Sequence, residues 1–286
     1  MTWIIYTCIS IFSRAIGSIA HKVLAKEVSA SGETLGFLFL TASLFLTFIA
    51  VPVFDLQIDT SFTKNEWLTL LGMALTQGIG VILYFKSLKR LSSSTAQIVF
   101  SSMLIFSTIF AIIFLDSHFT LINIVGIVTL ILAITLVSRH DLHGDTSGIV
   151  LMIASAFLFA IYQVISVAVV HTFTLVTYLL ATYLGAATCI ALYAPRTVFA
   201  EIVYSKDQVQ LLYLSLIAGA TSLGNVAFAY LAYASAPEPI KVALLLTTQV
   251  VVSVILAYIF LKERDDFFAK CVSAILVVIA GYALLG

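Results

Sequence analysis

Residues 107–115 read STIFAIIFL, and residues 253–261 read SVILAYIFL. The two stretches agree at six of nine positions and lie 146 residues apart. Further identities at this offset are Gly78 with Gly224 and Tyr84 with Tyr230. The chain of 286 residues therefore contains an internal repeat of close to half its length.

The composition around these stretches is that of a membrane protein. Hydrophobic residues make up 62% of the chain and charged residues 10%, with a mean hydropathy of +1.14. A soluble domain has too much surface to cover with so few charges, so most apolar side chains must face lipid or one another. Lys plus Arg equals Asp plus Glu at 14 each, which disfavours a nucleic-acid partner. We expect the lipid bilayer and a small molecule as partners.

Ten apolar runs are long enough to cross a bilayer core of about 30 Å as helices. Their approximate limits are 3–22, 33–54, 66–87, 94–115, 120–138, 147–170, 174–194, 209–232, 239–261 and 267–285. Charges gather between the runs, as at Lys26 and Glu27, and the connections 55–65 and 196–208 are too short to fold alone. The sequence predicts an all-α integral membrane protein with ten transmembrane helices.

The repeat places five runs in each half, residues 1–140 and 141–286. Two copies of an odd number of spans enter a membrane in opposite senses. We therefore expect two inverted five-helix repeats within one membrane domain. Many secondary transporters use this architecture for alternating access.

Arg14 is the one ionisable residue in the middle of a run, where an Arg costs about 2.5–3.5 kcal/mol on insertion scales. Its guanidinium could bind a carboxylate or phosphate, or it could instead lock helix packing by pairing with carbonyl groups. His21 and Lys22 follow near the end of this run, where we expect their polar ends to reach toward the interface.

All 14 carboxylates fall in connections or near the ends of runs. Exporters of cations commonly need a carboxylate inside the membrane. The pattern favours an anionic or zwitterionic metabolite, amino-acid-like or an organic anion, with proton or counter-substrate coupling open. A multidrug or lipophilic-cation exporter is the alternative.

Other polar residues occupy matching depths in the two halves and are candidates for a substrate site between them. With Arg14, the candidate substrate-binding residues are Gln77, Tyr84, Gln97, Tyr162, Gln163, Asn225, Tyr230, Thr248 and Gln249. Each could instead join helices by hydrogen bonds. Eight glycines should permit close helix contact: Gly72, Gly78, Gly80, Gly126, Gly185, Gly219, Gly224 and Gly281.

Enzyme motifs are missing from the sequence. It has no HExxH, GxxxxGK[ST] or GxGxxG, and the near match to GxSxG at residues 220–224 lies inside a span. Cys8, Cys189 and Cys271 lack the spacing of a metal site. We expect no catalytic residues, metal or cofactor. A channel or a membrane scaffold without transport activity is a further alternative.

Two segments resemble the EamA-type family of drug/metabolite transporters, whose ten-helix members carry two five-helix repeats. They are the pattern from Gly78 to Ser93, which includes Tyr84-Phe85 and Leu88-Lys89-Arg90-Leu91, and the helix ending Leu261-Lys262-Glu263-Arg264. The first copy of that ending, residues 115–118, lacks the Glu. Leu104 and Val250 replace a proline that is usual in the family. The resemblance implies an efflux or exchange transporter.

With ten spans, both termini lie on one side of the membrane. Eleven Lys and Arg residues fall in connections on the opposite side and two on the side of the termini, which predicts termini outside. The family resemblance implies termini in the cytoplasm, so the sequence leaves the orientation open. We expect a multi-pass protein of the bacterial inner (plasma) membrane.

Overall fold

The computed structural model describes residues 2–53, 63–114, 120–141, 146–169, 172–205 and 208–285. Within these ranges every regular element is an α-helix. Ten helical segments are long and apolar enough to cross a membrane, as predicted. The spans of the first half are α1 (Thr2–Glu27), α2 (Gly32–Val53), α3 (Lys64–Leu88), α4 (Ser93–Phe100) with α5 (Met103–Phe114), and α6 (Leu121–Asp141). Those of the second half are α7 (Thr146–Val169), α8 (Leu175–Tyr193), α10 (Gln208–Ser235), α11 (Pro239–Thr247) with α12 (Gln249–Phe260), and α13 (Phe267–Leu285).

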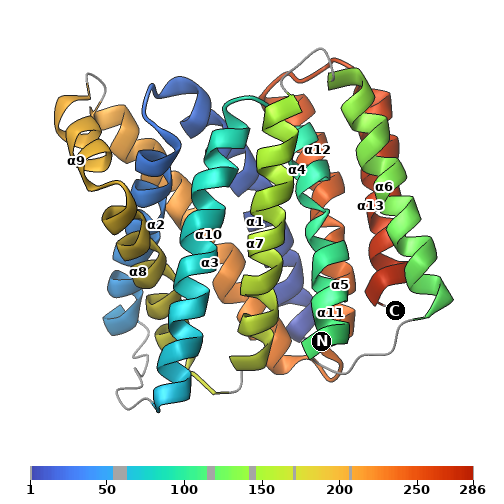
Figure 1. The fold of residues 1–286 in the computed structure, drawn as a ribbon, viewed down its shortest axis with the longest axis horizontal. Helices are drawn as coiled ribbons and strands as arrows, with labels where there is room; N and C mark the ends of the chain where they lie inside the picture. Colours follow the sequence, from blue (N-terminus) through green and yellow to red (C-terminus); the bar gives the residue numbers. More distant parts are fainter. Residues whose placement is uncertain are drawn as a thin grey trace.

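The spans stand side by side, and both chain ends lie toward the lower end of the bundle in Figure 1. Helix α1 packs along α10, α3 packs along α7, and α6 pairs with α13 at one edge. Because successive spans alternate in direction, the connections 28–31, 89–92 and 261–266 share the end opposite the termini. We call this the basic end, because the larger group of Lys and Arg residues flanks it.

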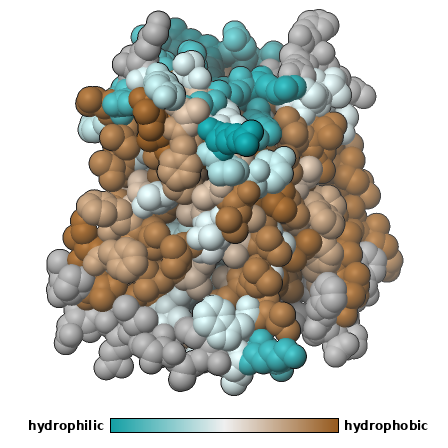
Figure 2. Space-filling model, turned by 60° about the vertical axis from the view of Figure 1, so that its left-hand side comes forward, coloured by the Kyte–Doolittle hydropathy of each residue, from teal (hydrophilic) through white to brown (hydrophobic). Residues whose placement is uncertain are grey.

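A belt of apolar residues covers the face seen in Figure 2, and hydrophilic residues gather at its upper, basic end. Large apolar side chains point outward along many spans, among them Leu121, Ile122 and Val125 on α6. A surface of this kind on a bundle of spanning helices is the surface that lipid chains cover. The protein is therefore a multi-pass integral membrane protein.

The fourth and ninth spans are each broken into two helices, which we did not predict. Ser101 and Ser102 separate α4 from α5, and Thr248 separates α11 from α12. At both breaks the backbone tightens to three-residue hydrogen bonds, including Ser102 N to Val99 O at 3.0 Å and Thr248 N to Leu245 O at 3.0 Å. Ser102 and Thr248 are 146 residues apart, so the breaks fall at equivalent positions of the repeat.

Hydroxyl groups explain these breaks in the absence of proline. The Thr248 hydroxyl donates to Leu245 O at 2.7 Å, and the Ser101 hydroxyl donates to Gln97 O at 3.0 Å. A Ser or Thr hydroxyl that bonds a carbonyl of the preceding turn competes with the helical pattern and bends the helix. Proline is therefore not required for a break at either position.

Two boundary predictions were wrong. Lys26 and Glu27 were expected between spans, but α1 continues through Glu27, and the break falls at residues 28–31. There the Ser31 hydroxyl accepts from Thr34 N at 3.2 Å and caps α2. The connection 196–208 holds a further helix, α9 (Pro195–Tyr204), which starts at a proline whose missing N–H is no loss in a first turn. Most of the connection 55–65 lies outside the described residues.

Close contacts surround most of the eight glycines, as expected. An added Cβ at Gly219 would lie 2.8 Å from Ser43 N and 2.9 Å from Ala42 Cβ, because α10 touches the backbone of α2 there. At Gly72 the nearest atom within 4 Å would be the flexible end of Ile165, at 3.5 Å. The glycine at 219 is therefore a packing requirement, whereas that at 72 is not.

We predict that Gly219→Ala destabilises the protein by about 1–3 kcal/mol, the usual cost of overpacking. Gly72→Ala is the matched control and should leave the melting temperature unchanged or slightly raised, since alanine favours helix. Thermal unfolding of both purified variants in the same detergent measures the difference. Equal melting temperatures would show that α2 and α10 can separate without cost.

Candidate substrate site

Arg14 lies on α1, half-buried, with its guanidinium carbon 5.4 Å from the centre of the Phe100 ring on α4. A cation above an aromatic face is attracted by the ring, but this contact leaves the five N–H donors of the guanidinium unused. Among the described residues Arg14 makes no hydrogen bond or ion pair. Arg14 is thus a cation inside a membrane span whose N–H donors are available to bind an anion.

Three further polar side chains meet above Arg14, toward the basic end. The Gln97 amide on α4 donates to the Tyr84 hydroxyl on α3 at 3.1 Å. His21 Nδ1 on α1 lies 3.4 Å from the same hydroxyl. Helices α1, α3 and α4 thus bring together the five residues that we call the Arg14 cluster: Arg14, His21, Tyr84, Gln97 and Phe100.

The expected exposure of His21 at the interface was wrong. Its side chain is 3% exposed and sits among the rings of Phe39, Tyr84 and Phe85. The reason is that α1 extends one further turn and a half beyond the predicted end, so His21 is interior. Its Nε2 atom has no hydrogen-bond partner, although it is buried.

Lys22, the next residue, does turn outward. Its ammonium donates to the carbonyl oxygens of Leu88 and Leu91 at 2.6 Å each. These carbonyls belong to the end of α3 and the turn that follows it, where cations favour the negative end of the helix dipole. Lys22 therefore fastens α1 to the connection 89–92.

A second polar group, the tyrosine cluster, lies between α7 and α8 and consists of Tyr162, Ser166, Tyr178 and Thr182. The two tyrosine hydroxyls are 2.8 Å apart, and Tyr178 donates to the Ser166 hydroxyl at 3.2 Å. The ring of Tyr230 on α10 packs 5.6 Å from that of Tyr178. Tyr178 could not be predicted as a member of this cluster, because it lies only four residues into its span and nothing in the repeat marks it.

A line of rings joins the two clusters. Centroid distances are 5.8 Å from Tyr84 to Phe100, 5.4 Å from Phe100 to Phe159, and 6.2 Å from Phe159 to Tyr162. A Cβ at Gly80 would lie 3.1 Å from the Phe159 ring, so the glycine lets α3 approach it closely. Phe100 and Phe159 thus form an apolar pair between two polar regions.

The other candidate residues belong to neither cluster, although the ring of Tyr230 packs on Tyr178. Gln163 accepts from the Ser107 hydroxyl at 3.3 Å and links α7 to α5. The Asn225 amide donates to the Ser10 carbonyl at 3.2 Å and hydroxyl at 2.9 Å, which links α10 to α1. The Tyr230 hydroxyl donates to Phe173 O at 2.7 Å, and Thr248 bonds within its own helix break. Gln249 is half-buried at the start of α12.

Gln77 stands out among these residues. It is buried on α3, and its Oε1 atom has no partner. Gln77 precedes Tyr84 by seven residues, as Arg14 precedes His21, and α1 and α3 run in the same direction. Because seven residues make close to two helical turns, Gln77 and Arg14 lie at similar depth, below the contact between His21 and Tyr84.

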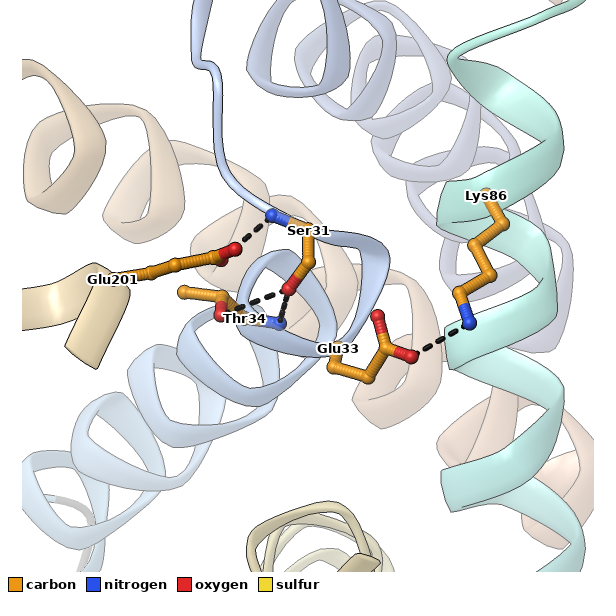
Figure 3. A network of polar contacts seen from close by, with 5 residues as sticks. All are labelled: Ser31, Glu33, Thr34, Lys86 and Glu201. Atoms are coloured by element: carbon orange, nitrogen blue, oxygen red, sulfur yellow. Dashed lines mark hydrogen bonds and ion pairs between the residues drawn. The ribbon is translucent and has the colours of Figure 1, made fainter. Parts of the chain in front are cut away.

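Charged side chains at the basic end hold the helix ends in place. Glu263 accepts from Ser93 N at 2.7 Å and from Ser94 N at 3.1 Å, so the second half of the chain caps α4 of the first half. In Figure 3, Glu201 of α9 accepts from Ser31 N at 2.7 Å at the start of α2. Lys86 on α3 pairs with Glu33 on α2 at 2.6 Å.

The surroundings of Glu201 favour its charged form. Partial burial acts to raise the pKa of Glu201, but hydrogen bonds from Thr34 and Ser31 outweigh it. The Lys89 cation adds to their effect, so the pKa of Glu201 lies below its ordinary value of 4.5. Its contribution to stability is therefore present above pH 4.5 and is lost as the pH falls through the lowered pKa.

We predict that Glu201→Gln lowers stability at neutral pH by about 0.2–1 kcal/mol, the range for partly exposed charge interactions. The difference from wild type should close as the pH falls below 4.5, because wild type then loses the same charge. Thermal unfolding from pH 7 downward measures it, with Asp265→Asn in the exposed connection as control. A difference that does not change with pH would contradict the role of the charge.

Within the described ranges no group of three His, Cys, Asp or Glu residues could hold a metal ion. The described carboxylates of the spans lie in terminal turns, as Glu33 and Glu66 do. The ionisable groups that face the interior are thus Arg14 and His21 together with tyrosines, and Lys270 is buried in the first turn of α13. The chemistry available there is the binding of anionic and hydrogen-bonding groups.

Comparison with known proteins finds one matching family model. The model of the EamA-like transporter family matches residues 1–139. The match covers just under half of the chain. Several solved chains share its fold. One, titled "Crystal structure of protein", is 14% identical, covers 98% of this chain and 94% of its own, and superimposes with a TM-score of 0.67. No curated protein matches the sequence.

Proposed function

We propose that this EamA-like protein is a secondary transporter for a small polar metabolite that carries a carboxylate or phosphate group. It exports or exchanges this metabolite across a bacterial inner membrane by alternating access. The single observation that carries the substrate class is Arg14, a guanidinium inside a span without an anionic partner among the described residues. The match of residues 1–139 to the EamA-like transporter family supports the transport activity.

Alternating access requires two halves that can rock against each other, and we assign this role to inverted repeats at residues 1–140 and 141–286. The helix pairing supports the assignment. Helix α1 packs on α10 as its counterpart α7 packs on α3, and α2 packs on α10 as α8 packs on α3. The breaks at Ser102 and Thr248 also correspond. Exchange of the two halves therefore leaves this pattern of contacts unchanged.

The two halves differ in charge, and this difference favours an anion. Arg14 on α1 supplies this charge in the first half, whereas the tyrosine cluster on α7 and α8 of the second half offers hydroxyl groups. A lipophilic cation would meet Arg14 without a carboxylate to offset its charge, which is costly where water is scarce. An anion would instead neutralise Arg14 and could accept bidentate hydrogen bonds from it. The site thus favours anions and zwitterions over cations.

The clusters suggest how such a solute would cross. From the basic end it would meet His21, Tyr84 and Gln97, and from the other end it would meet the tyrosine cluster. Phe100 and Phe159 lie between these two groups of residues, and the Arg14 guanidinium packs over the ring face of Phe100. Rocking of the halves would separate this apolar pair on one side at a time. Arg14 would hold the anion during the change.

We predict that a carboxylate or phosphate ligand raises the melting temperature of the purified protein. The panel consists of amino acids, dicarboxylates, phosphates, nucleosides and lipophilic cations. A ligand at 100 times its Kd adds about 2.7 kcal/mol, which corresponds to about 5–10 °C for a chain of this size. Arg14→Gln should abolish the shift, and Arg14→Lys should restore only part of it, because lysine lacks the planar fork.

Arg264→Gln, in the exposed connection 261–266, is the matched control and should keep the full shift. Stabilisation by cations alone, or a shift that persists in Arg14→Gln, would sink the proposed site. A ligand found in this way is then tested for saturable uptake into proteoliposomes. Single-channel currents in place of saturable flux would assign the protein to the channels instead.

A further inference from the structure

Helix α9, Pro195–Tyr204, lies at the basic end, at the upper left in Figure 1, where it contacts α2 and α8. Its ten residues reach about 15 Å, half the thickness of a bilayer core, so it cannot cross a membrane. It lies nevertheless at the level where spans leave the bilayer. Such a helix either rests in water against the protein or lies along the membrane surface.

The inner face of α9 is tied to the protein. Val198 is fully buried and Ile202 half-buried, one helical turn apart. Between them Glu201 accepts from Ser31 N at the start of α2, as Figure 3 shows. These contacts leave the opposite face of the helix pointing away from the bundle.

The outer face of α9 is apolar and exposed. Phe199 is 60% exposed, Val203 58% and Tyr204 82%. Together with the exposed Arg196 and Ala200, these residues follow a spacing of three and four and thus form one stripe along the helix. A helix in water would carry polar residues on this face, and the only charge on the stripe, Arg196, stands at its first turn.

The stripe continues the lipid-facing surface of the neighbouring spans. Large exposed side chains lie on both sides of α9 along the chain: Leu192 and Tyr193 at the end of α8, and Val209, Leu212 and Tyr213 at the start of α10. Tyrosines are common where a bilayer meets water, because the ring prefers the acyl boundary and the hydroxyl prefers water. Tyr193, Tyr204 and Tyr213 are exposed tyrosines of this kind on α9 and on the adjoining ends of α8 and α10.

We propose that the outer stripe of α9 is a binding surface for anionic phospholipid in the leaflet at the basic end. Phe199, Val203 and Tyr204 insert at the boundary between headgroups and acyl chains, and Arg196 binds the lipid phosphate. Among the described residues Arg196 has no hydrogen bond or ion pair of its own. The phosphate of an anionic headgroup supplies the negatively charged partner that this guanidinium lacks within the protein.

Lipid is the occupant that fits better than a second protein. Its acyl chains already cover the surface with which the stripe is continuous, and anionic headgroups complement a protein end rich in Lys and Arg. A protein partner would have to displace lipid headgroups, because the stripe lies at the depth that headgroups occupy. The stripe is also too narrow to bury the area of a stable dimer by itself.

The surface has a mechanical consequence. Glu201, on the inner side of α9, holds Ser31 at the start of α2, and Glu33 two residues later pairs with Lys86 on α3. Lys86 lies two residues beyond Tyr84 of the Arg14 cluster. Lipid bound to α9 therefore steadies the end of α2 and, through the pair of Glu33 with Lys86, the end of α3 that carries Tyr84. The inference does not depend on which solute is transported.

The test places a tryptophan on the stripe by Phe199→Trp in the full-length protein. The variant is reconstituted into phosphatidylcholine vesicles with increasing fractions of phosphatidylglycerol that carries brominated acyl chains. The difference spectrum against wild type isolates the new residue from Trp3 and Trp67. Leu212→Trp on α10 calibrates a lipid-facing position, and Asp265→Trp in the connection 261–266 calibrates an aqueous one. Val203→Trp, one turn along, repeats the measurement.

We expect the tryptophan at 199 to be quenched by brominated lipid as in the Leu212 variant and to resist aqueous iodide. Phosphatidylglycerol should be preferred over phosphatidylcholine, and Arg196→Gln should reduce this preference by about fivefold, the effect of one cation near an anionic surface.

Quenching by iodide, as in the Asp265 variant, would place the stripe in water and overturn the proposal. Protection from both quenchers would mean that protein covers the stripe, which also overturns it. A lipid preference that survives Arg196→Gln would remove the assigned headgroup contact.

Discussion

Backbone hydrogen bonding inside a bilayer is the constraint on which the rest of this structure depends. Without water, each N–H and C=O of a span must bond within its own helix or to a nearby side chain. The two departures from regular helix, at Ser102 and Thr248, therefore occur where hydroxyls and three-residue hydrogen bonds take over the carbonyls. Close helix contact at glycines such as Gly219 follows from the same need to pack without hydrophobic driving force in lipid.

Within that frame the few interior polar groups divide into those with partners and those without. Asn225 and Gln163 join helices, and the tyrosine cluster satisfies its own hydroxyls. Arg14, His21 Nε2 and Gln77 Oε1 remain without hydrogen-bond partners among the described residues, and so do the hydroxyls of Ser215, Ser253 and Ser273 in the second half. A polar group without a hydrogen-bond partner costs free energy in a low dielectric. Several such groups near one another therefore indicate a position where a ligand or water binds. Arg14 gives the site in the first half a charge that the repeat alone does not imply.

The candidate site was partly predictable. Arg14 stood out because no other charge lies in mid-span, and Tyr84 and Gln97 stood out by their depth; the structure brings all three into one cluster. His21 could not be placed from sequence, because its burial depends on where α1 ends, and Lys26 and Glu27 suggested an earlier end. The role of Asn225 was equally hidden, since its partner Ser10 lies 215 residues away. The breaks at Ser102 and Thr248 were missed because proline was the expected signal.

The sequence by itself determined the ten spans, the internal repeat, the absence of mid-span carboxylates and the unequal distribution of Lys and Arg. These are properties of local composition and order, because the partition of a segment between water and lipid depends on the hydrophobicity of its own residues. Only the tertiary structure decided which polar groups find partners and which remain free, that Glu201 and Glu263 cap helices of the other half, and that α9 turns an apolar stripe outward. Those outcomes depend on distances between helices far apart in the chain, and such distances follow from packing, not from local pattern.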